Sequence, residues 1–458
     1  METQDQARIT SSELFTALSY ALDITQGQPK GHAVRCCWIG IHIAQKLALK
    51  KEQIRELYYT VLLKDAGCSS NAARLFQLYG CDERKIKSDF KKVNSDKLLQ
   101  VLNFIIKNTS LSEGHLKKLK RIVHFVRNGK QLTAELIQTR CERGANITLR
   151  LGFSEAVADS VRHLDEHYNG GGRPGGLAGD RIPLYSRIAL LAQVADVFYH
   201  IGGPEAAQKE IQSRKGTWFD PEVVEAFLKA SQDPSFWKIR DEDLTQQALA
   251  SLEPDGGKIS VSESYLDTVA LAFADIIDAK SPFTFGHSTR VAAYADTLAA
   301  QMGIDEKRRR WFYRGSLLHD IGKLGVSNAI LDKPGKLTEE EFAQVKLHPK
   351  YTEEILSKIA IFKDLAQMAG AHHERLDGKG YHKGLTAKDI CLETRILTLA
   401  DIFDALSAKR PYRDAMPLEK ILVVLEEMRG TAIDSNCLDE FKKVLDKILP
   451  QMKLNPHQ

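Results

Sequence analysis

One series of motifs occurs twice along this chain, in the same order both times. His32 precedes Lys64 by 32 residues, and His287 precedes His319 by the same 32. The matched segments are GH (31–32 and 286–287), LLKDAG and LLHDIG (62–67 and 317–322), LDEHYNGGGRPGGL and HHERLDGKGYHKGL (164–177 and 372–385), VADVF and LADIF (194–198 and 399–403), and KGTWFDPEVVEAF and RGTAIDSNCLDEF (215–227 and 429–441). Five matches in one order predict two copies of a single fold. The first copy is longer by roughly fifty residues, at about 82–130.

Apolar residues recur at three- and four-residue spacing through most of the chain, as in LDTVALAFADIIDA (266–279). This period is typical of amphipathic helices, and no segment alternates as a strand would. Thr338 and Glu341 form a capping box, which marks the start of a helix. The prediction is an all-α fold with two tandem helical bundle domains.

The join between the copies is predicted where Pro254 and Gly256-Gly257 interrupt the helical pattern. The expected domains are therefore 1–252 and 263–450, with a linker at 253–262. A length of 458 residues suits two domains better than one.

Composition excludes several classes of function. The net charge of +4 is small for this length, which argues against a binder of nucleic acid polymers. No apolar run approaches the about 18 residues of a membrane span. The seven cysteines include no C-x-x-C pair, a pattern that favours reduced thiols. A cytoplasmic protein without membrane association is expected.

Five of the chain's fourteen histidines, together with two aspartates, lie at motif positions in and around the segment LLHDIGK (317–323) of the second copy. Imidazoles with a few carboxylates are the ligands that divalent first-row metals prefer, and these are more than one ion needs. The candidate ligands are His287, His319, Asp320, His348, His372, His373 and Asp401.

The segments GHS (286–288), LLHDIGK (317–323), HPKYTEEIL (348–356), HHERLDGKGY (372–381) and LADIFDALSAKRPYR (399–413) resemble an HD-GYP phosphodiesterase domain of the HD superfamily. The resemblance covers about 263–445 and implies HD-type helical bundles. It also implies hydrolysis of cyclic dinucleotides, either cyclic di-GMP or 3′,3′-cyclic GMP-AMP, to the linear dinucleotide. Two other functions stay open: a non-hydrolytic cyclic dinucleotide sensor, and a hydrolase of mononucleotides.

The resemblance assigns the candidate ligands to two ions, with Asp320 between them. His287, His319 and Asp401 would hold the first ion, and His348, His372 and His373 the second. Such a pair can hold a bridging hydroxide for attack on the phosphate. Family members with a third ion use a glutamate where this chain has Phe283, so two ions are expected. Iron or manganese is favoured, and zinc, cobalt and nickel are alternatives.

Several further residues are expected to contact substrate. Lys323, four residues after His319, is predicted to share the ligands' helix face and to stabilise charge on the phosphate. Gly380 and Tyr381 belong to the glycine-rich loop, in which His382 replaces the proline of the family's Gly-Tyr-Pro signature. The arginines Arg314, Arg375 and, more weakly, Arg410 and Arg413 are candidate phosphate or base contacts, with ion pairs between helices as the alternative.

The first copy has lost most of these residues. The alignment retains His32, Asp65 and Asp196, with about three extra residues before Asp196, but Lys64 replaces the histidine of the pair. The positions of His348, His372 and His373 fall on Arg140, Leu164 and Asp165. The first copy is therefore expected to be non-catalytic. It would pack on or regulate the second copy, or mediate a homodimer.

Overall fold

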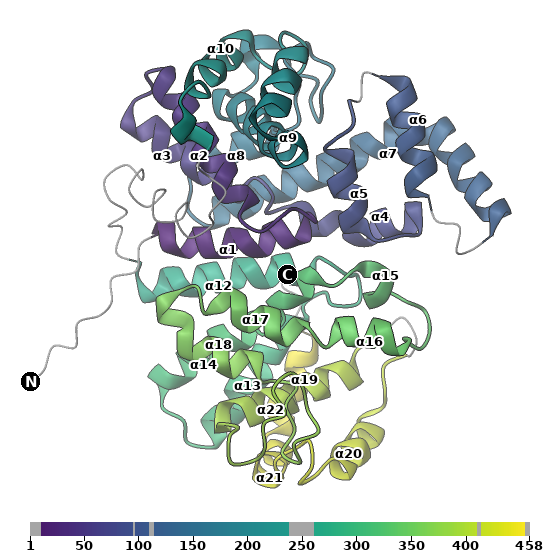
Figure 1. The fold of residues 1–458 in the computed structure, drawn as a ribbon. Coiled ribbons are helices and arrows are strands. Elements are labelled where there is room, and N and C mark those ends of the chain that lie inside the picture. Colours follow the sequence, from purple (N-terminus) through teal and green to yellow (C-terminus); the bar gives the residue numbers. More distant parts are fainter. Residues whose placement is uncertain (1–10, 95–96, 110–113, 238–260, 410–413, 454–458) are drawn as a thin grey trace, which may run out of the picture. The chain divides into compact units, whose positions relative to one another are not determined.

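The computed structural model describes residues 11–94, 97–109, 114–237, 261–409 and 414–453. The chain divides into two compact units, Met1–Val261 and Ser262–Gln458. The predicted linker, 253–262, falls at this division, and all but its last two residues lie outside the described ranges. Helices and short turns make up both units, and the described residues contain no strand, only three isolated bridges. The all-α prediction is confirmed (Figure 1).

The first unit contains α1 (Ser11–Thr25), α2 (His32–Lys46), α3 (Lys51–Leu63), η1 (Cys68–Asn71), α4 (Ala72–Tyr79), α5 (Glu83–Phe90), α6 (Leu98–Asn108), α7 (His115–Arg150), α8 (Glu155–Arg162), η2 (Gly179–Arg181), α9 (Leu184–Ser213), α10 (Pro221–Ala230) and η3 (Pro234–Trp237). Helix α9 is interrupted at Gly202 and Gly203, where the backbone is not helical.

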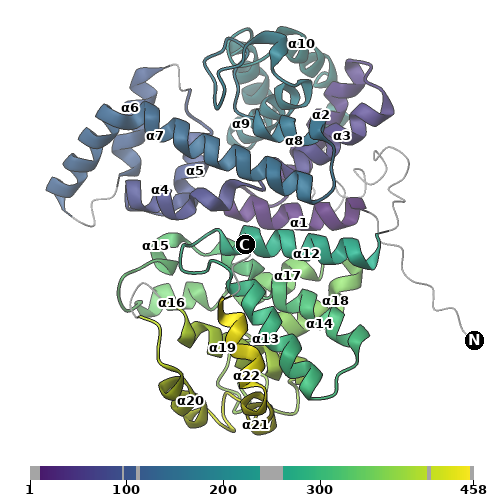
Figure 2. The same ribbon diagram turned by 180° about the vertical axis from the view of Figure 1, so that it is seen from behind.

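The second unit contains α12 (Glu263–Asp278), α13 (His287–Gln301), α14 (Glu306–Leu318), η5 (Ile321–Gly325), α15 (Asn328–Leu331), α16 (Glu339–Val345), α17 (His348–Leu356), η6 (Ala360–Phe362), α18 (Lys363–Gly370), α19 (Leu392–Ser407), α20 (Leu418–Glu427), α21 (Ser435–Lys443), α22 (Leu445–Ile448) and η7 (Leu449–Lys453). Helix α13 packs against α12, α14 and α19, as Figure 2 shows from behind. The predicted capping box of Thr338 and Glu341 begins α16.

Helix α12 illustrates why these segments fold as they do. Its apolar residues recur at helical spacing, and Leu266, Val269, Phe273 and Ile277 are all buried. Ser262 caps its first turn by accepting a hydrogen bond from the Tyr265 backbone N–H. The helix is therefore specified by its cap and by the apolar face that it buries.

The two units repeat not only motifs but individual hydrogen bonds. In the glycine-rich loop of the first unit, the Glu166 carboxylate accepts from the backbone N–H groups of Gly175 and Leu177. In the second unit, the Glu374 carboxylate accepts from Lys383 and Leu385 at the matched positions. The predicted repeat is therefore present in the fold.

These shared contacts correct the alignment of the last helical motif. Asp196 accepts hydrogen bonds from His32 Nδ1 and Arg35, and the same contacts in the second unit are made by Asp404, not by Asp401. The same register continues from the glycine-rich loop, so the predicted three extra residues are absent there. The pairing of Asp196 with Asp401 was wrong. Gln193 occupies the position of Asp401 in the first unit.

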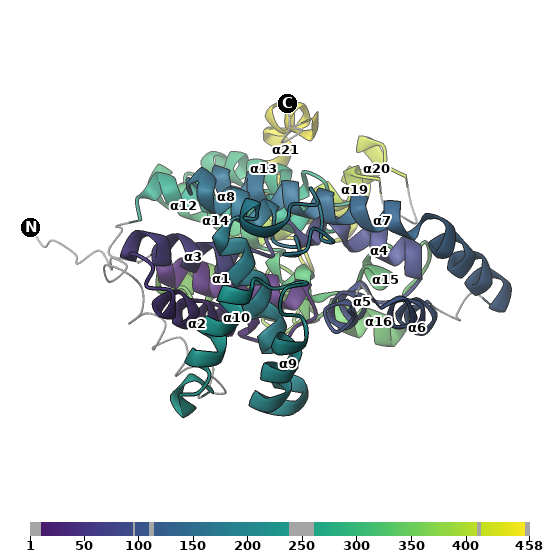
Figure 3. The ribbon, with the colours of Figure 1, turned by 90° about the horizontal axis from the view of Figure 1, so that it is seen from above.

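The extra segment of the first copy, together with α4 before it, forms a small helical subdomain. It contains α4, α5, α6 and the first half of α7, which extend beyond the rest of that unit (Figure 3). Its own buried cluster consists of Tyr79, Ile86, Phe104, Ile105, Phe125 and Leu132. The insertion thus packs on itself and does not interrupt the repeated helices.

Gly322 shows how tightly η5 packs against α17 in the second unit. A Cβ there would lie 1.9 Å from the His348 carbonyl oxygen and 2.7 Å from the Thr352 nitrogen. Gly67 meets Arg140 and Gly144 in the same way in the first unit. Both glycines are therefore required by a close approach of two backbones.

We expect Gly322→Ala to destabilise the protein by about 1–3 kcal/mol, because the added methyl group must push α17 away. Denaturant unfolding followed by circular dichroism measures this loss. Gly335→Ala is the control, since a Cβ there meets nothing within 4 Å. Equal midpoints for the two variants would contradict the close packing of η5 and α17.

Candidate metal centre

The seven predicted ligands come from five segments of the second unit and meet in its interior. His287 is the first residue of α13, and His319 and Asp320 follow the end of α14. His348 is the first residue of α17, His372 and His373 follow α18, and Asp401 lies within α19. All except His373 are buried. Residues far apart in sequence are thus brought into one polar cluster within an apolar bundle.

Asp320 lies between two groups of histidines. Its Oδ2 is 3.3 Å from His287 Nε2 and 3.4 Å from His319 Nε2. Its Oδ1 is 3.4 Å from His348 Nε2 and 3.7 Å from His372 Nε2. One carboxylate oxygen therefore faces each group, which is the geometry of a bridging ligand.

The remaining ligands join the same two groups. Asp401 Oδ1 is 3.3 Å from His287 Nε2, and His287, His319 and Asp401 can offer ligand atoms within 4.8 Å of one another. His348, His372 and His373 form a second such set. The structure thus brings together both sets of residues that the sequence assigned to two ions.

Hydrogen bonds orient the imidazoles. The Nδ1 atoms of His319, His348 and His372 lie 2.6–2.7 Å from the carbonyl oxygens of Ser316, Val345 and Ala369. A carbonyl only accepts, so each Nδ1 carries the proton and donates it. Each Nε2 then presents its lone pair to the cluster, as a metal ligand must.

The buried polar atoms at the middle of the cluster fit a cation. His287 Nε2, His319 Nε2 and Asp320 Oδ1 have no hydrogen-bond partner among the described residues. Burying such atoms unpaired is costly, and a divalent ion with bound water would satisfy them. The donor set of imidazoles and carboxylates agrees with such an ion.

Electrostatics favour the forms that bind metal. Burial lowers the pKa of His348 to about 3 and that of His372 to about 4, so both are neutral at pH 7. Burial opposes ionisation of Asp320, but the charges of His319 and Lys323 hold its pKa well below the usual range. His348 and His372 are thus in the metal-binding form beside an ionised carboxylate. Burial opposes protonation of His287, but hydrogen bonds to Asp320, Asp401 and Asp404 outweigh it and raise the pKa of this imidazole, so metal binding there would release a proton.

Lys323 lies at this cluster, although not on the predicted helix face. Helix α14 ends at Leu318, and Lys323 belongs to the 3-10 turn η5. Its ammonium group pairs with Asp320 Oδ2, and the side chain is largely buried. The expectation of one continuous helix through LLHDIGK was wrong, but the turn still places the lysine beside the ligands.

Asp404 fixes the orientation of His287. Its Oδ2 accepts from His287 Nδ1 at 2.7 Å, and its two oxygens also accept from the Arg290 guanidinium at 2.7 and 3.0 Å. Burial opposes its ionisation, yet the bond from His287 and the charges of His287 and Arg290 lower the pKa of Asp404 to about 2. From the sequence, Asp404 was expected to serve helix packing or to support a ligand rather than to coordinate directly, and its bond to His287 agrees with the supporting role.

The glycine-rich loop places Tyr381 over the second group of ligands. The Tyr381 ring stacks on His373 with centroids 4.9 Å apart and planes at 27°. A Cβ on Gly380 would lie 2.4 Å from Glu374 Cα, so this glycine permits the loop to fold back on itself. Gly380 therefore shapes the loop, while Tyr381 offers a ring to the centre.

The arginines predicted to contact substrate differ in their partners. Arg314 is buried, and it pairs with Asp267 and Glu263 of α12, which favours the helix-to-helix alternative over a substrate contact. Arg375 pairs with Asp377 inside the glycine-rich loop and stays partly exposed. Arg410 and Arg413 lie outside the described residues.

Cationic side chains surround the part of the first unit that matches the ligand cluster of the second. Lys64 pairs with Asp65, Lys91 Nζ lies 3.5 Å from His32 Nε2, and Arg140 pairs with Asp165. His32 and Asp196 do lie near Cys36, and these three form the only potential ligand group in the described part of the first unit. Both oxygens of Asp196 are already bonded to His32 and Arg35, however.

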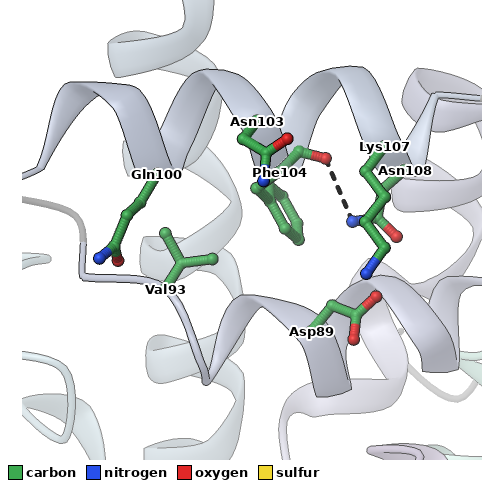
Figure 4. Close-up of a pocket in the computed structure, with 7 residues that line it drawn as sticks. All are labelled: Asp89, Val93, Gln100, Asn103, Phe104, Lys107 and Asn108. Atoms are coloured by element: carbon green, nitrogen blue, oxygen red, sulfur yellow. Dashed lines mark hydrogen bonds between the residues drawn. The ribbon is translucent and has the colours of Figure 1, made fainter.

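A separate pocket of about 180 Å³ lies in the inserted subdomain of the first unit (Figure 4). Its walls come from α5, α6 and their connection, and Asp89 is the one carboxylate among the residues drawn. No histidine or cysteine lines it. It therefore lacks the donor set of the candidate centre.

Fold and side chains together define a class: a helical protein with a buried cluster of imidazoles and carboxylates whose donor atoms suit divalent cations. The family model described as HD domain matches residues 114–223 and 272–437. The chain is 50% identical over 447 residues to 3′3′-cGAMP-specific phosphodiesterase 3 of Vibrio cholerae serotype O1, covering 97% of both chains. It also resembles a cyclic di-GMP phosphodiesterase response regulator of Xanthomonas campestris, at 36% identity over 46% of this chain and 55% of the other.

A solved structure also matches the fold of this chain. The crystal structure of a cyclic GMP-AMP-specific phosphodiesterase from Vibrio cholerae matches with a TM-score of 0.67 and 46% identity, over 95% of this chain and 98% of that chain. The chain belongs to the HD domain family, as an HD-GYP phosphodiesterase. Among the described residues, no helix is both long and apolar enough to cross a membrane.

We expect Asp404→Asn to weaken metal binding by about 10–100-fold, because the amide no longer offers His287 Nδ1 a charged acceptor. Metal content measured against graded chelator concentrations tests this. Asp196→Asn is the matched control, since Asp196 makes the same bonds in the first unit. Wild-type metal retention in Asp404→Asn would show that Asp404 does not support the centre.

Proposed function

We propose that the second unit hydrolyses bacterial cyclic dinucleotides to the linear dinucleotide at a centre of two divalent cations. The observation that carries this proposal is the position of Asp320, with one oxygen toward each group of histidines. The names of the relatives support the substrate class, since they include enzymes for cyclic GMP-AMP and for cyclic di-GMP.

Each part of the centre then has a task. Two bound cations would supply an activated water, as a hydroxide shared between them, and charge that holds the phosphate. Asp320 would join the two cations, and the six other ligands would fix their separation. Phe283, which cannot coordinate, supports two ions, and the mixed donor set favours iron or manganese.

Lys323 is the proposed electrostatic catalyst. Its ammonium group lies at Asp320 on the side of His287 and His319, where a phosphate bound to the cations would come within reach. Charge that develops on the phosphate oxygens would be stabilised by this fixed cation. Tyr381, stacked on His373, would border the same space from the second group.

Cyclic GMP-AMP is the proposed preferred substrate, because the relative that matches over nearly its full length is named for it. Hydrolysis of cyclic GMP-AMP, cyclic di-GMP and cyclic di-AMP, measured side by side with the metal-loaded protein, tests this order. Binding without turnover would favour a sensor instead. Turnover of mononucleotides alone would favour the broader hydrolase activity.

The first unit is proposed to be non-catalytic, in a structural or regulatory role. Three of the ligand positions are changed in the first unit: His319, His348 and Asp401 are replaced by Lys64, Arg140 and Gln193. Neither of the two ligand groups is therefore complete there. We therefore expect close to two bound metals per chain, and none in the first unit.

We expect His319→Ala and Asp320→Ala each to abolish turnover and to lower the bound metal, since each removes a ligand that no neighbour replaces. Product formation and elemental analysis of the same samples measure both effects. Lys64→Ala, at the matched position of the first unit, should keep the wild-type metal content. A variant of His319 or Asp320 with normal activity would rule out the proposed centre.

We expect Lys323→Ala to keep both metals and to lower kcat by about 100-fold, because it removes a charge needed mainly in the transition state. Steady-state kinetics with metal content checked separate the two effects. Lys333→Ala is a control, since this lysine pairs with Glu341 on the surface. An unchanged kcat in Lys323→Ala would remove the assigned role.

A further inference from the structure

Phe342, in α16, exposes its phenyl ring near the candidate centre. Phe342 is 45% exposed and Phe285 is 42% exposed, whereas five other phenylalanines in the described second unit are buried: Phe273, Phe312, Phe362, Phe403 and Phe441. An exposed phenyl ring forgoes the free energy gained by leaving water. Next to a polar centre, such a ring is typical of a binding surface.

A series of aromatic contacts connects Phe342 to the ligands. The Phe342 and Tyr381 rings are edge to face, with centroids 6.3 Å apart and planes at 80°. Tyr381 in turn stacks on His373 at 4.9 Å. Phe342 is thus two ring contacts from a candidate ligand, and the series runs from the buried centre to an exposed ring.

Lys346 adds a cation to the exposed end. It follows α16 as its C-cap residue, and its Nζ lies 5.1 Å from the centroid of the Phe342 ring. The ammonium group lies over the face of the ring, so a base that stacks there would displace it, and the long lysine side chain would then donate to the edge of the base. Guanine presents two acceptors, O6 and N7, on one edge, whereas adenine presents N7 beside an amino group.

The first copy has lost this series together with the ligands. In the register set by Arg140 and His348, the position of Phe342 holds Ala134 and that of Lys346 holds Gln138. Arg173 takes the place of Tyr381 in the glycine-rich loop. The exposed ring, the cation and the stacked tyrosine therefore occur only in the copy that has the complete ligand set.

We propose that Phe342 and Lys346 form a nucleobase site that binds one purine of the cyclic dinucleotide, with guanine preferred. This proposal rests on the proposed function, and it adds a substrate contact outside the metal centre. Stacking on Phe342 would hold one base while the adjoining phosphodiester lies at the cations. Because only one base is read by Lys346, a substrate with a single guanine suffices.

The main test compares Phe342→Ala and Phe342→Trp in the full chain loaded with metal. Losing a stacked base should raise KM for cyclic GMP-AMP by about tenfold or more, with the loss falling on KM rather than kcat. Phe342→Trp should restore KM, since indole also stacks. Val423→Ala, which trims another exposed apolar side chain in α20, should behave as wild type.

A second arm tests the guanine preference. Lys346→Met keeps the length of the side chain and removes its charge. It should lower kcat/KM for cyclic di-GMP by about tenfold and leave cyclic di-AMP little affected. Equal losses on both substrates would overturn the preference for guanine while leaving the stacking site in place.

Binding of the same dinucleotides, measured by titration calorimetry, separates this proposal from the proposed function. A wild-type protein that binds but does not cleave would overturn the proposed function alone. A Phe342→Ala variant that binds and turns over cyclic GMP-AMP as wild type does would overturn the nucleobase site alone. Loss of bound metal in Phe342→Ala would also count against it, because the ring would then support the centre and not the base.

Discussion

The bridging position of Asp320 is the contact on which the rest of the centre depends. A single carboxylate faces two imidazoles with each oxygen, so four side chains from four segments must approach it at once. That approach requires η5 to lie directly against α17, which Gly322 permits. It also requires each imidazole to present its Nε2, which carbonyl acceptors behind His319, His348 and His372 achieve, with the Asp404 carboxylate behind His287. The packing of the helices around the centre therefore depends on the position of Asp320.

In the first unit, the buried aspartate at the position of Asp320 is Asp65, and its charge is compensated differently. Asp65 is paired with Lys64, and burial, which opposes its ionisation, is outweighed by the charges of Lys64 and Lys91, so its pKa falls far below the usual range. Lys91 reaches this place from the segment that follows α5, in the insertion that the second unit lacks. Amines of the chain supply the positive charge that the proposed cations would supply in the second unit. The inserted Lys91 and the substituted Lys64 therefore act on the same buried carboxylate.

Periodic and local features of this chain could be predicted from its sequence. Helical spacing predicted the fold class, and the order of histidines and aspartates identified all seven members of the cluster. The sequence could not fix the register of a helix: Asp401 and Asp404 are three residues apart, so both lie on one face of α19, and a match to VADVF cannot tell them apart. Only the hydrogen bonds from His287 and Arg290 show that Asp404 is the residue that matches Asp196. The sequence could not decide between the two roles open to Arg314 for a related reason, since its partner Asp267 lies 47 residues away.

The loop that contains His382 explains how the centre tolerates the loss of the family's proline. Proline would restrict the backbone by its ring. Here the side chains take part instead: His382 Nε2 lies 3.2 Å from Glu353, and Lys383 Nζ donates to the same carboxylate at 2.6 Å. Glu353 belongs to α17, the helix that begins with His348, so the loop is attached to a ligand-bearing element. Together with the backbone bonds to Glu374, this attachment holds Tyr381 over His373 without a proline. The replacement therefore shifts the restraint from the loop's own backbone to a helix of the metal centre.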